Sequence, residues 1–211
     1  MYPELQLTVD GIANSGKTIS TERAERLGAI AAWIKAQCAK GNTAHLAFIC
    51  THNSRRSQFA QVWAKVAAHR TGLKDIHTSS AGTEGTAVAS PVIDALRAQG
   101  FRVDGAGDLD IHGNAVRTQY LVNYDDEEPP VLLFSKSISD RDDTAVDFAA
   151  VMVCSDADEN CPFVPGAVMR FSLPYEDPKE SDGTADEART YQERSLDIAR
   201  EMNHLMDLVI G

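Results

Sequence analysis

Short apolar runs alternate along this chain with stripes of apolar residues at helical spacing. Four runs predict strands, at residues 45–49, 76–79, 148–153 and 167–173. Stripes with positions three and four apart predict helices over 91–98, after the first strand (Phe59, Val62, Trp63 and Val66) and near the C-terminus (Tyr191, Ile198, Met202, Leu205 and Val209). Strands that alternate with helices predict an α/β fold, a three-layer sandwich in which helices flank a central four-stranded parallel sheet.

Residues 1–43 precede the first strand and predict an N-terminal helical extension. One apolar stripe runs along this segment, formed by Leu27, Ile30, Ala31, Ile34 and Cys38. Ser20 or Thr21 is expected to cap the helix. Because Cys38 lies on the stripe, we expect it in the core and not in catalysis. The chain then divides into this extension and one α/β domain, residues 44–211.

A candidate nucleophile stands at the end of the first strand. The strand ends at Cys50, Arg56 follows six residues later, and a helical pattern begins there. This order builds a cradle for a tetrahedral oxyanion, because loop amides and a helix start direct positive charge at one point. The same field favours the thiolate form of Cys50, which is the form that attacks.

The side chains of this loop fit that chemistry. The guanidinium of Arg56 can bind two oxygens of the anion at once. Ser57 can donate to the sulfur, and Asn53 tolerates the left-handed backbone that suits a tight curl. We expect the anion to be bound by Arg56 and its neighbours in the loop, Thr51, His52, Asn53, Ser54, Arg55 and Ser57.

Composition and charge narrow the classes of partner and compartment. The formal net charge is −11, which argues against nucleic acid or an anionic membrane as a partner. No apolar run reaches the length of a membrane span, and no signal peptide is evident, so we expect a cytoplasmic protein. Four cysteines, Cys38, Cys50, Cys154 and Cys161, are too few for a secreted disulfide scaffold and suggest catalysis, redox chemistry or metal binding.

Neither a metal nor a cofactor is expected. Cys154 and Cys161 are seven positions apart, unlike a zinc half-site, and His77 and His112 are isolated. Gly11–Thr18 matches the nucleotide phosphate loop G-x-x-x-x-G-K-[ST]. The segment before it is short and polar, so we favour a turn that interrupts a helix. A nucleotide-binding protein using Lys17 stays as the alternative from another class.

The loop Cys50-Thr51-His52-Asn53-Ser54-Arg55-Arg56-Ser57-Gln58 resembles the low-molecular-weight protein tyrosine phosphatase superfamily, and in particular its thioredoxin-coupled arsenate reductases. Their loop reads C-T-G-N-S-C-R-S-Q. This chain departs at His52, where glycine is usual, and at Arg55, where cysteine is usual. Arg55 either adds a second positive charge or points to solvent. Three further segments resemble the family in the same order, Ser80–Glu84, Val151–Pro162 and Tyr175–Pro178.

The resemblance implies an activity and roles for the residues. Cys50 would attack arsenate, Asp177 would protonate the departing oxygen, and Cys154 would then attack the Cys50 sulfur and expel arsenite. Cys161 would take over the disulfide with Cys154, and thioredoxin would reduce it. The alternative within the superfamily is a phosphatase that hydrolyses phosphate monoesters with Cys50, Arg56 and Asp177 alone.

Two segments carry expectations about local structure. Residues 103–136 lie outside the resemblance and contain turn signals at Asp104-Gly105, Gly107 and Gly113-Asn114. Extended patterns over 117–124 and 131–134 predict an inserted hairpin or long loop. Between Cys154 and Cys161, a polar and acidic composition predicts a mobile loop.

Overall fold

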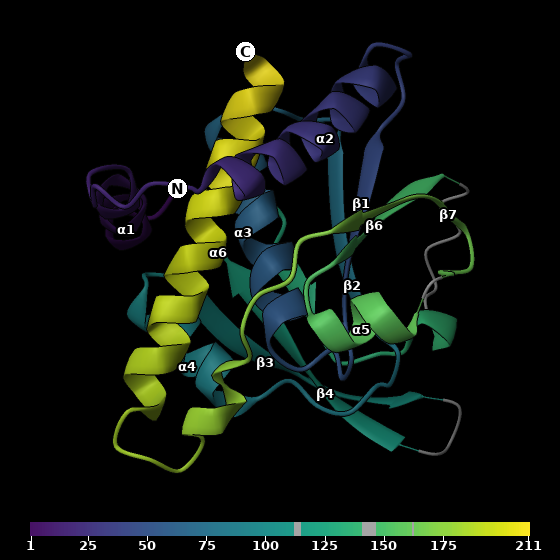
Figure 1. Ribbon diagram of the computed structural model, residues 1–211. Coiled ribbons are helices and arrows are strands. Elements are labelled where there is room, and N and C mark those ends of the chain that lie inside the picture. The colour runs from purple at the N-terminus through teal and green to yellow at the C-terminus, as the bar shows by residue number, and fades with distance from the viewer. Residues whose placement is uncertain (112–114, 141–146, 162) are drawn as a thin grey trace.

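A four-stranded, fully parallel sheet forms the centre of the computed structural model, which describes residues 1–111, 115–140, 147–161 and 163–211 (Figure 1). Helices flank the sheet, so the predicted α/β architecture is confirmed. In sheet order the strands are β2 (Ile76–Gly82), β1 (Ala44–Cys50), β6 (Phe148–Met152) and β7 (Ala167–Ser172). All four predicted strands are therefore present, with β1 in the interior of the sheet.

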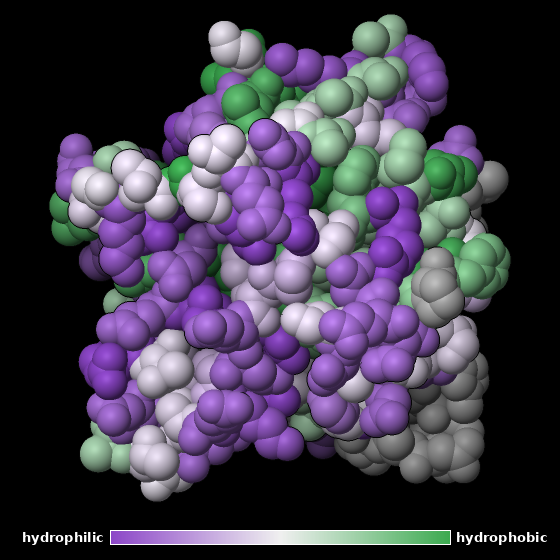
Figure 2. Space-filling view, in the orientation of Figure 1, coloured by the Kyte–Doolittle hydropathy of each residue, from purple (hydrophilic) through white to green (hydrophobic). Residues whose placement is uncertain are grey.

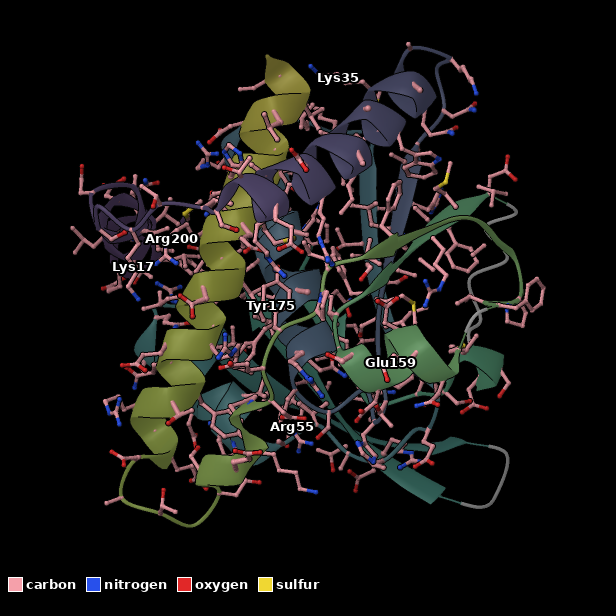
Figure 3. The ribbon with its side chains drawn as sticks, in the orientation of Figure 1. Lys17, Lys35, Arg55, Glu159, Tyr175 and Arg200 are labelled. Carbon is pink, nitrogen blue, oxygen red and sulfur yellow. The ribbon has the colours of Figure 1, made fainter. Side chains whose placement is uncertain are left out.

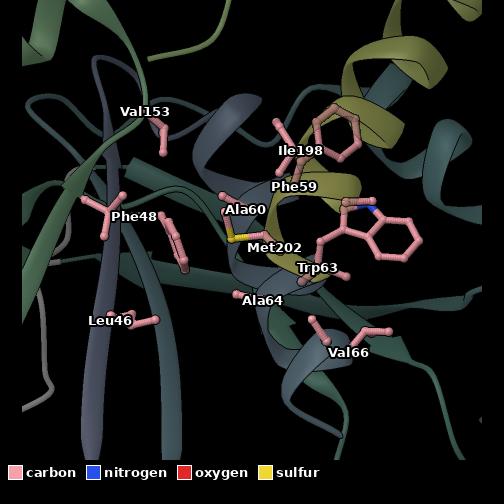
Figure 4. Packing of buried hydrophobic residues seen from close by; sticks show 14 of the residues in the cluster. Leu46, Phe48, Phe59, Ala60, Trp63, Ala64, Val66, Val153, Ile198 and Met202 are labelled. Carbon is pink, nitrogen blue, oxygen red and sulfur yellow. The ribbon is translucent and has the colours of Figure 1, made fainter. Parts of the chain in front are cut away.

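Helix α3 (Arg56–Arg70) is buried on more sides than its sequence predicts. The expected face of Phe59, Val62, Trp63 and Val66 is buried, but Gln58 and Gln61 are buried as well. These two glutamines are buried because α3 lies between the sheet and the long C-terminal helix α6 (Glu187–Ile210). Figure 4 shows apolar side chains of α3 clustered with Leu46 and Phe48 of β1 and with Ile198 and Met202 of α6.

The N-terminal segment is helical, as predicted. It forms α1 (Pro3–Ala13) and α2 (Thr21–Cys38), and Ser20 caps α2 by accepting a hydrogen bond from the Arg23 amide. The stripe of α2 is buried except for Cys38, which is partly buried against the core. Residues 5–9 lie in helix α1 and not in a strand, so the phosphate-loop-like motif lacks the strand that a nucleotide site needs.

A second sheet, which is antiparallel, contains three strands from the part of the chain after α4 (Ser90–Ala98). Its strands are β3 (Arg102–Ile111), β4 (Ala115–Asn123) and β5 (Val131–Leu133). The predicted hairpin is present, but Gly105 and Gly107 lie within β3 and do not form turns. The register shifts between Gly105 and Asp108, so these glycines accompany a β-bulge. Gly113 and Asn114 lie outside the described residues.

The remaining helices are short. They are α4 (Ser90–Ala98) and α5 (Ser155–Asn160), with single turns η1 (Ile138–Asp140) and η2 (Pro178–Ser181). Figure 2 shows one face of the molecule, on which hydrophilic side chains predominate. None of the helices in the described part of the chain is both long and apolar enough to cross a membrane.

One buried hydrogen bond between α3 and α6 offers a test of the core. The indole N–H of Trp63 donates to the hydroxyl of Ser195 at 2.9 Å, and both residues are fully buried. We expect Ser195→Ala to lower the free energy of unfolding by about 1–3 kcal/mol, because the indole N–H loses its acceptor in a site that water does not reach. Urea unfolding measures the change.

Thr43→Ala, at an exposed position, serves as the control and should change the free energy by less than about 0.5 kcal/mol. Equal stabilities for Ser195→Ala and the wild type would contradict the importance of this bond.

Candidate active site

Cys50 lies at the carboxyl end of interior strand β1 and is 3% exposed. Its sulfur is 3.1 Å from the Ser57 hydroxyl oxygen, which also accepts a hydrogen bond from the Asn53 amide at 2.9 Å. Because that bond uses an acceptor position of Ser57, the hydroxyl hydrogen is free to donate to the sulfur. Asn53 has a φ of 47°, so the predicted left-handed residue is present. The Asn53 amide thus orients the Ser57 hydroxyl toward the Cys50 sulfur.

The backbone of the loop has its carbonyls paired and its amides unpaired. Every carbonyl from residue 50 to residue 54 accepts a hydrogen bond, from donors in Thr83, Glu84, Thr86, Ser135, Gln58 and Ala89. Within the described part of the chain, the amides of residues 51–55 donate none. Unpaired amides in succession, followed by the N-terminus of α3, form a concavity suited to an anion.

Residues outside the loop hold this backbone in place. The Lys136 amide donates to the Asn53 side chain at 2.9 Å, and the Gln58 side chain donates to the carbonyls of Asn53 and Phe134. Gly82 at the end of β2 has no room for a side chain, since a Cβ atom there would lie 2.6 Å from the Thr51 carbonyl oxygen. The sequence analysis missed Gln58 and Lys136, whose contacts to the loop leave no signal in a local pattern.

Two arginines of the loop region, Arg55 and Arg56, both bind the carboxylate of Asp177. The Arg55 Nε donates to Asp177 Oδ1 at 2.8 Å, and the Arg56 Nη2 donates to Asp177 Oδ2 at 2.6 Å. Arg55 is 11% exposed, so the alternative in which it points to solvent is wrong. These three residues and Cys50, with His52 and Ser54, line a narrow hollow. The structure thus gathers the predicted nucleophile, anion-binding arginine and acid in one place.

Helix α2 supports the segment that carries Asp177. Arg56 donates through Nη1 to the Tyr175 carbonyl at 2.9 Å, and the Tyr175 hydroxyl donates to Glu201 at 2.7 Å. Arg23 of α2 pairs with Glu201 and donates to the Pro174 carbonyl at 2.7 Å (Tyr175 is labelled in Figure 3). Burial, together with the negative charge of Glu201, raises the pKa of Tyr175 well above its usual range, so this hydroxyl stays a donor. Neither Arg23 nor Glu201 was predicted to matter for the site.

Cys154 lies beside the loop, and Cys161 lies further away. Strand β6 pairs with β1 up to Ile49 and Met152, so Cys154 emerges at the same sheet edge as Cys50. Its sulfur accepts a hydrogen bond from the Ala157 amide at 3.3 Å and is 3.5 Å from the Thr51 hydroxyl. The predicted mobile loop is wrong, because the residues between the cysteines form helix α5, with Cys154 as its N-cap and Cys161 just after its end.

The cysteines carry no disulfide in this structure, where all four are free thiols. Cys154 is fully buried, whereas Cys161 is partly buried and donates to the Phe163 carbonyl. The chain therefore holds one buried and one accessible thiol at the two ends of α5.

Comparisons with known proteins agree with this geometry. The family described as low molecular weight phosphotyrosine protein phosphatase matches residues 45–128. An arsenate reductase from Staphylococcus aureus (strain Newman) is 30% identical over 131 residues, which cover 62% of this chain and 76% of the relative. The chain belongs to the low-molecular-weight protein tyrosine phosphatase superfamily.

Two further proteins extend the comparison within this superfamily. An arsenate reductase from Bacillus licheniformis is 27% identical over 150 residues, 71% of this chain and 85% of the relative. The crystal structure of a YwlE mutant from Bacillus subtilis aligns with a TM-score of 0.50 and 14% identity, over 80% of this chain and 99% of that one. The second likeness bears on the fold alone.

Other candidate sites weighed in the sequence lie away from this loop. Lys17 is 62% exposed, and its amine is 3.8 Å from Asp197 of α6. The described residues hold no group of three or more side chains suited to a metal ion. His112 lies outside the described residues.

Alkylation tests whether Cys50 is the reactive thiol. We expect iodoacetamide to label Cys50 rapidly near neutral pH and inorganic phosphate to block the reaction, because loop amides and Ser57 stabilise the thiolate. Cys38 should react more slowly, since burial and the nearby Asp75 raise its pKa. Peptide mass mapping measures both rates. Labelling of Cys50 that is slow and indifferent to phosphate would contradict its assignment.

Proposed function

We propose that this enzyme reduces arsenate to arsenite through Cys50, Cys154 and Cys161, with thioredoxin as the reductant. The observation that supports this most is the second thiol beside the oxyanion loop. Cys154 lies 3.5 Å from the hydroxyl of Thr51, the residue that follows the nucleophile. Hydrolysis of a phosphate ester has no use for that thiol, whereas a reduction needs it. Arsenate reductases from Staphylococcus and Bacillus among the relatives support the same function.

The residues supply each step of this reduction. Amides of residues 51–55 and the Arg56 guanidinium bind arsenate, and the Cys50 thiolate attacks arsenic as one oxygen leaves with a proton from Asp177. Cys154 then attacks the Cys50 sulfur, and the electron pair of the S–As bond stays on arsenic, which departs as arsenite. Cys161 attacks Cys154 and frees Cys50. A dithiol of thioredoxin reduces the resulting Cys154–Cys161 disulfide.

Helix α5 must unwind during this sequence. Its two flanking cysteines are separated by about 10 Å along the helix axis, at about 1.5 Å per residue. A disulfide requires Cα atoms roughly 4.4–6.8 Å apart. The helix is anchored by Ala157, which is buried, and by Asp158, which pairs with Arg170 of β7 at 2.6 Å and accepts from the Ser172 hydroxyl. Arg170 also donates to the backbone carbonyls of Asp158 and Cys161. A helix this short has little stability of its own, so the contacts with Arg170 and Ser172 are what hold it, and they must break when it unwinds.

A phosphatase that uses Cys50, Arg56 and Asp177 is the second candidate. The observation in its favour is the position of Asp177, which is hydrogen bonded to Arg56 over the hollow that Cys50 lines. That arrangement suffices for attack on a phosphate monoester and protonation of the leaving oxygen, after which water would hydrolyse the phosphocysteine. In this reading Cys154 and Cys161 are dispensable.

Cysteine variants separate the two functions. With thioredoxin, its reductase and arsenate, the wild type should turn over repeatedly. Cys161→Ser should stop after one arsenite per enzyme, because the Cys50–Cys154 disulfide is no longer resolved. Cys154→Ser should release no arsenite and still attack an aryl phosphate. Arsenite release and peptide mass mapping after one equivalent of arsenate measure these outcomes.

Cys38→Ser is the matched control, since it removes a thiol outside the site, and it should turn over like the wild type. The reductase function fails if the wild type shows no thioredoxin-coupled turnover and Cys161→Ser yields no Cys50–Cys154 peptide. Aryl phosphate hydrolysis that survives loss of both Cys154 and Cys161 would then establish the phosphatase.

A further inference from the structure

We propose that Arg55 is a positioning residue, which holds Asp177 in place to protonate the leaving oxygen after the oxyanion has taken over Arg56. The proposal rests on the proposed function of the loop as an oxyanion site with Cys50 as nucleophile. It concerns a position at which the superfamily's loop usually has cysteine, and where this chain places a second buried guanidinium.

The two oxygens of the Asp177 carboxylate bind different arginines. Its Oδ1 accepts from the Arg55 Nε at 2.8 Å and from the Lys179 amide at 3.2 Å. Its Oδ2 accepts from the Arg56 Nη2 at 2.6 Å. One oxygen is therefore anchored by Arg55 and the backbone of η2. Among the described residues, the other oxygen is anchored by Arg56 alone.

Not every nitrogen of the Arg56 guanidinium has a hydrogen-bond partner among the described residues. Its Nη1 is committed to the Tyr175 carbonyl, and its Nε is buried with no hydrogen-bond partner in the described part of the chain. Nε and Nη2 point to the same side of a guanidinium and form the pair that binds two oxygens of one anion. An oxyanion that binds this pair competes with Asp177 for Nη2.

Arg55 determines where Asp177 stays once the oxyanion has taken Nη2. The contacts of Oδ1 do not involve Arg56, so they remain when Oδ2 is released. The Arg55 side chain is itself fixed, because it is 11% exposed. Oδ2 is then free to carry the proton, at the mouth of a hollow that Cys50 also lines.

Protonation of the leaving oxygen can be measured by comparing good and poor leaving groups. As the Cys50 sulfur bonds to phosphorus, the bond from phosphorus to the leaving oxygen breaks, and the proton on Asp177 Oδ2 moves to that oxygen. Phenolate is a poor leaving group and needs this proton, whereas dinitrophenolate leaves well without it. Loss of a correctly held acid must therefore slow phenyl phosphate far more than dinitrophenyl phosphate.

Single-turnover release of the phenol from these two esters tests the inference. Arg55→Ala should slow phenyl phosphate by about 10-fold or more, part of the roughly 100- to 10 000-fold that a general acid contributes, and dinitrophenyl phosphate by less than about 3-fold. Arg55→Lys should fall between Arg55→Ala and the wild type. In an Asp177→Asn background, Arg55→Ala should no longer discriminate between the esters, because the acid that it positions is absent.

Arg70→Ala is the matched control. Arg70 is the last residue of α3, at the end of the helix opposite to Arg55, and it binds Asn203 and Asp207 of α6. Because these contacts lie away from the loop, the reaction of neither ester should be affected. Reaction of dinitrophenyl phosphate also shows that each variant is folded.

Equal losses on both esters would overturn the inference and indicate that Arg55 binds the oxyanion or supports the loop. A selective loss that persists in the Asp177→Asn background would overturn it as well, and so would a wild type that releases no phenol from either ester. Thioredoxin-coupled arsenite production is measured separately, so failure of this inference is distinguishable from failure of the proposed reductase function.

Discussion

The backbone of residues 50–55 is the constraint on which the site depends. Its carbonyls are bonded to the β2–α4 connection, to Gln58 and to Ser135, and its amides are left without acceptors among the described residues. Unpaired buried amides are costly, and an anion that accepts from several of them removes that cost. Much of the surrounding structure keeps this backbone in place. Gly82 allows its close approach, and Asn53 takes the left-handed turn.

The loop is a locally positive site in an acidic protein. The chain has a formal net charge of −11, yet Arg55 and Arg56 are both held beside Cys50 with a single carboxylate, Asp177, between them. In the free enzyme that carboxylate neutralises part of the positive field and occupies one donor of Arg56. Under the proposal above, an oxyanion bound by Arg56 takes the place of this carboxylate. The segment that carries Asp177 is fixed by Tyr175, Glu201 and Arg23, which connects helix α2 to the acid.

Local patterns predicted the parts of the fold that depend on local sequence. The four strands, the Ser20 cap and the curl at Asn53 follow from apolar runs, capping chemistry and backbone preference. Gly105 and Gly107 were interpreted as turns because a glycine signals a bulge and a turn equally well, and only pairing with β4 distinguishes them.

Long-range contacts account for the remaining errors. The segment after Cys154 was expected to be mobile, but Cys154 caps it, Asp156 lies favourably in its first turn, and Asp158 pairs with Arg170 of β7. The sequence left open whether Arg55 adds charge to the site or points to solvent. Its partner Asp177 is 122 residues away, beyond the reach of any local pattern. The division of the chain at residue 44 and the roles of the individual site residues stay predictions.

A crystal structure of the wild-type enzyme with bound inorganic phosphate tests the central claim most directly. The account predicts that the ion accepts hydrogen bonds from the amides of residues 51–55 and from Nε and Nη2 of Arg56, with Asp177 released from Arg56 and retained by Arg55. An ion bound elsewhere, or an Asp177 carboxylate that stays on Arg56 with the loop amides unpaired, would contradict it.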